Sequence, residues 1–75
     1  MKELIFKVYQ ENDGGYVAKT KLEKGSIITE GDNLDELKNM IIDAVKGFFF
    51  DKPKEMPDSI RLHFVKVNEE IFALA

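Results

Sequence analysis

One histidine and a set of carboxylates are the side chains of this 75-residue chain that could take part in catalysis. Histidine is the residue type whose charge changes near neutral pH, so His63 is the obvious candidate for a general base. Carboxylate oxygens are the ligands that Mg²⁺ and similar hard cations prefer. The carboxylates available are Asp13, Glu30, Asp32, Asp35, Glu36 and Asp43. The first three of these, together with His63, would serve a small metal-dependent nuclease or hydrolase.

Each of these side chains also has a simpler role. His63 alternates with Arg61 along a predicted strand, which is typical of an exposed face or a cross-strand pair. Asp13 precedes two glycines in a predicted turn, and carboxylates near a helix start are favoured by the helix dipole. Ser26 and Ser59 have no histidine and aspartate partners at a recognisable spacing. The chain is therefore expected to have no catalytic residue, no metal and no cofactor.

Composition narrows the function classes further. The chain has no cysteine and one histidine, so it offers neither a thiol nucleophile nor a cysteine or histidine metal cluster. Eleven Lys and Arg against fourteen Asp and Glu give a net charge of −3, without a basic block in the sequence. Because nucleic-acid binding depends mainly on neutralising phosphates, direct binding of nucleic acid is not expected.

The sequence also predicts how the chain is organised. Glu3 and Lys7 interrupt the apolar run of the first ten residues, and no small-residue cleavage site follows, which predicts neither a signal peptide nor a membrane span. A cytoplasmic protein is the expectation. No repeat, low-complexity tract or linker divides the sequence, so residues 1–75 are expected to form a single domain. A chain this short buries a limited core, and oligomerisation is the remaining source of stability.

The stretch 31–50 predicts the one long helix. Asn33 followed three residues later by Glu36 is a variant of the capping box, which marks the helix start. Apolar residues recur at steps of three and four and form one stripe that suits packing on a sheet. This stripe consists of Leu34, Leu37, Met40, Ile41, Ala44, Val45 and Phe48. The helix is expected to end within 46–50, where Gly47 indicates a frayed last turn or a close approach to the sheet.

Alternating apolar and polar residues predict the strands. They are expected at 2–10, 16–20, 26–30 and 60–67, with a further apolar strand at 70–75. Asp13-Gly14-Gly15 is a hairpin signal, and Lys21–Gly25 is expected to form the next turn. Two prolines limit a loop after the helix. The predicted fold is α+β in two layers: an antiparallel three-strand sheet, then the helix, then one or two further strands, βββαβ(β).

Two apolar segments are candidates for a subunit interface. Phe48, Phe49 and Phe50 cannot share one helical face, so at least one is expected to project outward unless all three pack on the sheet and the following loop. A terminal strand that is apolar on both sides is an aggregation hazard unless it is paired or buried. Its candidate contact residues are Ile71, Phe72 and Leu74. Both segments favour a homo-oligomer, a dimer or larger.

Two short motifs stand in a defined order along the chain. Gly-Gly-Tyr-Val-Ala occupies 14–18, and Thr-Glu-Gly-Asp-Asn-Leu-Asp-Glu-Leu occupies 29–37. This order resembles the amino-terminal domain of HicB-like antitoxins, in which the first motif opens the second strand and the second motif opens the helix. The resemblance covers residues 2–50, and the ending looks like that of the compact stand-alone members of about this length.

The resemblance implies a βββαβ fold similar to part of ribonuclease H, without catalytic function. It implies a protein that binds and masks a small, basic, RNA-cleaving toxin of the HicA type within a toxin–antitoxin system. Full-length HicB proteins also carry a carboxy-terminal DNA-binding domain, for which this sequence shows no segment, so operator binding is not expected. The alternatives are a structural or ligand-binding homo-oligomer and the metal-dependent nuclease described above.

Overall fold

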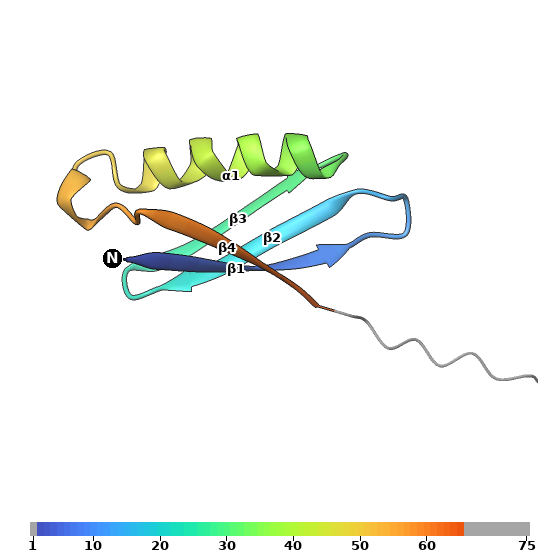
Figure 1. Cartoon of the computed structure of the whole chain (residues 1–75), viewed down its shortest axis with the longest axis horizontal. Helices are drawn as coiled ribbons and strands as arrows, with labels where there is room; N and C mark the ends of the chain where they lie inside the picture. Colours follow the sequence, from blue (N-terminus) through green and yellow to red (C-terminus); the bar gives the residue numbers. More distant parts are fainter. Residues whose placement is uncertain (1, 66–75) are drawn as a thin grey trace, which may run out of the picture.

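The order of helices and strands is βββαβ, as the sequence predicts (Figure 1). The computed structural model describes residues 2–65. Its elements are β1 (Glu3–Gln10), β2 (Tyr16–Leu22), β3 (Gly25–Gly31), α1 (Leu34–Phe48), the short 3₁₀ helix η1 (Pro53–Glu55) and β4 (Ser59–Phe64). The predicted fifth strand at 70–75 and the last residues of the predicted strand 60–67 lie outside the described residues.

The four strands form one mixed sheet in the order β3-β2-β1-β4. β2 is antiparallel to both of its neighbours, β1 and β3, whereas β4 is parallel to β1. Parallel neighbours need a long crossover connection, and α1 with the loop after it supplies one. The alternation of residues predicted the strands themselves but did not specify the direction of the last one.

Both hairpins of the antiparallel part contain a glycine with positive φ. In the first turn Gly14 has φ +92°, and the Gly15 N–H donates to Asp13 Oδ1 at 3.0 Å. The second turn is tighter than the predicted five-residue turn, because Leu22 pairs with Gly25 and both belong to strands. Only two residues therefore connect β2 and β3.

The helix begins where the sequence predicts. Asn33 is its N-cap, and the Asn33 Oδ1 accepts a hydrogen bond of 2.8 Å from the backbone N–H of Glu36. A side-chain acceptor at this position satisfies one of the amide groups that the first turn leaves without a partner. The helix ends at Phe48, within the predicted interval.

The core lies between α1 and the sheet. The buried apolar residues are Phe6, Val8, Ala18, Ile27, Leu37, Ile41 and Val45. The predicted stripe is wrong at Met40, which is 42% exposed, about as much as Ile42 at 43%. Successive residues of a helix are about 100° apart, so Met40 and Ile42 flank the buried Ile41 on either side. Both flanks face away from the sheet, which is why neither is buried.

Candidate functional site

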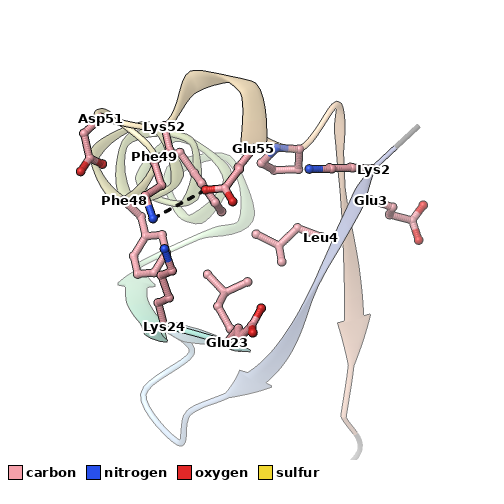
Figure 2. Close-up of a pocket in the computed structure, with 12 residues that line it drawn as sticks. Lys2, Glu3, Leu4, Glu23, Lys24, Phe48, Phe49, Asp51, Lys52 and Glu55 are labelled. Carbon is pink, nitrogen blue, oxygen red and sulfur yellow. Dashed lines mark ion pairs between the residues drawn. The ribbon is translucent and has the colours of Figure 1, made fainter.

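A cleft of about 520 Å³ lies at the carboxyl end of α1 (Figure 2). Three segments that are distant in the sequence border it: the start of β1, the β2–β3 turn and the chain that follows the helix. Its apolar lining residues are Leu4, Leu22, Phe48, Phe49 and Pro57. Its charged lining residues are Lys2, Glu3, Glu23, Lys24, Asp51, Lys52 and Glu55. We call this feature the end cleft.

The aromatic wall of the end cleft comes from the last turn of the helix. The rings of Phe48 and Phe49 meet edge to face, with centroids 5.1 Å apart and an angle of 69° between their planes. Both side chains are half-buried and pack against the core, whereas Phe50 is 85% exposed. One of the three consecutive phenylalanines therefore projects outward, as predicted. Their role in a subunit interface stays a prediction.

Two lysines face one another at the mouth of the end cleft. Figure 2 shows Lys24, from the β2–β3 turn, and Lys52, from the loop after the helix, with their amino groups pointing together. Lys52 lowers the pKa of Lys24, because a neutral Lys24 amine can accept a hydrogen bond from the Lys52 ammonium and because two ammonium groups repel one another. The same hydrogen bond raises the pKa of Lys52, whose Nζ also lies 4.0 Å from Glu55 Oε2. Lys24 is therefore the amine of this pair that loses its proton first.

The end cleft continues into an apolar strip on the helix side of the sheet. Within residues 2–65, the backbone of α1 lies close to β3 and β2 but not to β1 or β4. The helix therefore lies over the β2 and β3 half of this face, although Phe6 and Val8 of β1 are buried in the same core. The other half presents Leu4, Ile60, Leu62 and Phe64, which we call the β4 strip. Leu4 lines the cleft and pairs with Ile60, so the two features form one surface.

Exposure along the β4 strip rises toward the end of the strand. Ile60 and Leu62 are half-buried and touch the core, but Phe64 is 51% exposed and contacts the ring of Tyr16. The Tyr16 and Phe64 rings lie edge to face with centroids 6.5 Å apart. The sequence pattern placed Ile60, Leu62 and Phe64 on one face, but the amount of that face left uncovered depends on where the helix lies.

The residues considered for catalysis are spread over the molecule. His63 is exposed on β4, and Glu30 is exposed on β3 at the opposite edge of the sheet, with β1 and β2 between them. Asp13 accepts a hydrogen bond within its own turn, and Asp32 stands just before the helix cap. In the part of the chain that the structure describes, no three histidine or acidic side chains gather as metal ligands do.

One set of predicted residues remains to be placed. Ile71, Phe72 and Leu74, the other interface candidates, lie outside the described residues. Sequence reasoning did not find the Lys24–Lys52 pair, because the two residues lie on different segments. Over residues 2–65, α1 is neither long nor apolar enough to cross a membrane.

One comparison with known proteins gives a relative. The chain is 43% identical over 65 residues to a UPF0150 protein of Thermotoga maritima. The aligned part is 87% of this chain and 86% of that protein, so the similarity extends over nearly the whole of both. No family model matches the chain, and no solved structure does.

Proposed function

This chain belongs to the UPF0150 protein family, a name that states no activity, and from that premise we propose that it is a cytoplasmic, non-catalytic, HicB-like binding module. Its partner in this proposal is a small, basic, RNA-cleaving protein of the HicA type, which the module masks as an antitoxin does. The proposal is supported by the resemblance of the 14–18 and 29–37 motifs and by the surface on the helix side of the sheet.

The observation that carries the proposal is the apolar surface formed by the end cleft and the β4 strip. A monomeric protein rarely leaves a continuous apolar surface open unless that surface binds something. The β4 strip also lies along β4, which is at the edge of the sheet. An edge strand can pair with a strand of another protein by backbone hydrogen bonds. A protein partner can therefore bury apolar side chains and pair with the edge at the same place.

Charge favours a basic partner over an acidic one. Of the carboxylates that border the end cleft, Glu3 pairs with Arg61, and Glu23, Asp51 and Glu55 equal the three lysines there in number, so the cleft itself is close to neutral. The chain as a whole carries a net charge of −3. Opposite net charges raise the rate at which two proteins meet, so a small basic nuclease would be attracted to this chain.

Affinity purification from the native host tests the proposal. The wild-type chain is expected to retain a small basic protein that cleaves RNA once it is released. Phe64→Lys places a charge in the β4 strip and is expected to lose that protein. Ile42→Lys is the control, since it places the same charge at an exposed apolar side chain of α1 outside the strip. The proposal fails if no basic protein is retained, or if Phe64→Lys retains as much as the wild type.

The non-catalytic part of the proposal has its own test. The purified chain is incubated with RNA and either magnesium or manganese, and intact RNA is the expected result. RNA cleavage that disappears in His63→Ala would instead support the metal-dependent nuclease. The separation of His63 from Glu30 by two strands supports the non-catalytic alternative.

We also propose that the chain forms a homo-oligomer through the Phe50 region. Phe50 is the most exposed of the large apolar side chains in residues 2–65 and lies next to the half-buried Phe49. A ring left in water is a frequent anchor of subunit contacts. This contact is separate from the β4 strip, so self-association and partner binding are compatible.

A further inference from the structure

The face of the sheet opposite α1 gathers basic side chains. Among the described residues no helix or strand covers this face, as Figure 1 shows. Alternate residues of every strand point to it. Its basic residues are Lys7, Lys19, Lys21, Arg61 and His63, and all five are exposed. We call this group the basic patch.

Strand register places three of these side chains in one row. Lys7 of β1 pairs directly with Lys19 of β2 on one side and with His63 of β4 on the other. Neighbouring strands lie about 4.8 Å apart, so the row is about 10 Å wide. Lys21, two residues after Lys19 on β2, and Arg61, two residues before His63 on β4, lie on the same face. Residues that are spread over the sequence therefore form one cluster.

The strands place two carboxylates on this face, Glu3 and Glu30, against the four Lys and Arg side chains of the basic patch. Arg61 is paired with Glu3, with 2.9 Å between Arg61 Nε and Glu3 Oε1. For Lys7, Lys19 and Lys21, residues 2–65 provide no ion pair. Like charges directly opposite one another destabilise a pair of strands. An anionic ligand on this face would remove that repulsion.

Apolar side chains lie between and beside the basic ones. Tyr9 follows Lys7 on this face of β1, and its ring centroid lies 5.4 Å from Lys19 Nζ. Ile5 is 50% exposed and Ile28 is 65% exposed, each on the same face. Aromatic and aliphatic surfaces beside cations suit the bases and phosphates of a single nucleic-acid strand. In a duplex the bases are stacked inside and are not free to lie on a sheet.

We infer that this open face binds single-stranded nucleic acid, with phosphates at Lys7, Lys19 and Lys21 and a base on the Tyr9 ring. The inference goes beyond the proposed function and uses the opposite side of the sheet, so the β4 strip stays free for a protein. With about three phosphate contacts, the logarithm of the binding constant should fall with the logarithm of salt concentration with a slope of about −2.

Fluorescence anisotropy at low salt tests this inference with a labelled single-stranded RNA of mixed sequence, its DNA counterpart and the matching duplex. The double variant Lys7→Gln/Lys19→Gln is expected to weaken single-strand binding at least about tenfold and to reduce the salt slope by about 1.4. Tyr9→Leu is expected to weaken binding while leaving the salt slope unchanged, because it removes stacking and no charge.

The control variant Lys38→Gln/Lys46→Gln removes the same charge from exposed positions on α1. It is expected to bind the single strand as the wild type does, and thermal unfolding verifies that every variant is folded. Equal losses in both double variants, equal binding of the duplex, or no binding by the wild type would each overturn the inference. Displacement of the RNA by polyglutamate at matched charge concentration would also overturn it and point to an acidic protein.

Discussion

Gly31 lies where the end of β3 closely approaches the first turns of the helix. A Cβ added to Gly31 would lie 2.6 Å from the backbone N of Leu37 and 2.8 Å from its Cα. Real Cβ atoms do not approach backbone this closely, so any larger side chain must displace the helix start from β3. At Gly47, the other glycine near the helix, an added Cβ would have no neighbour within 4 Å. The close approach suggested for Gly47 is therefore found at Gly31 instead.

Alanine substitutions at Gly31 and Gly47 are expected to change stability in opposite directions. Gly31→Ala is expected to lower the free energy of unfolding by about 1 to 3 kcal/mol, as overpacking of a close contact does. Gly47→Ala makes the same chemical change in open space and is expected to raise it by up to about 1 kcal/mol, because alanine favours the helix. Urea unfolding of both variants measures the difference. Wild-type stability in Gly31→Ala would mean that the helix start shifts without cost.

The helix shows how far a sequence period determines burial. Leu37, Ile41 and Val45 are at most 4% exposed and form its central row against the sheet. Local periodicity predicted this row correctly because all three residues lie on one element. It included Met40 in error, because the width of the buried stripe is set by the sheet and not by the helix.

Ile41 and Met40 are neighbours in the helix, but only Ile41 is buried. Ile41→Ala is expected to reduce the free energy of unfolding by about 2 to 5 kcal/mol, since it leaves a cavity in the core. Met40→Ala removes a side chain of similar size from the exposed flank and is expected to cost under about 1 kcal/mol. Thermal and urea unfolding compare the two. Similar losses in both variants would show that the helix is rotated relative to the orientation described here.

The whole molecule presents three different surfaces on a small two-layer fold. The helix side offers the end cleft and the β4 strip, the last turn of α1 exposes Phe50, and the opposite side of the sheet carries the basic patch. The net charge of −3 conceals this division, because acidic residues elsewhere outnumber the basic ones. The charge of the whole chain predicted no binding of nucleic acid. We infer that single-stranded nucleic acid does bind, because Lys7, Lys19 and Lys21 cluster on one face of the sheet.

Solution mass tests the proposed self-association. Light scattering over a dilution series is expected to give at least twice the chain mass of 8.6 kDa. Phe50→Lys is expected to return the protein to the mass of one chain, because a charged side chain at the contact opposes its burial. Phe64→Lys is expected to leave the mass unchanged. A wild-type protein that is monomeric at every concentration would contradict the proposed homo-oligomer, and it would leave the partner experiment unaffected.

The sequence by itself determined the features that depend on near neighbours in the chain. Asn33 and Glu36 are three residues apart and make the helix cap directly. Gly14 adopts the positive φ that its own turn requires. Strand faces also follow from alternation, since successive side chains point to opposite sides. The order βββαβ could be predicted because each of its elements has such a local signal.

Only the tertiary structure decided what depends on how the elements lie together. The parallel pairing of β4 with β1 brings His63 beside Lys7, and the antiparallel register brings Lys19 to its other side. The position of α1 over β3 and β2 leaves the β4 strip open and forms the end cleft. These contacts join residues that are far apart in the sequence and form only when the elements pack together. A pattern of neighbouring residues therefore cannot predict them.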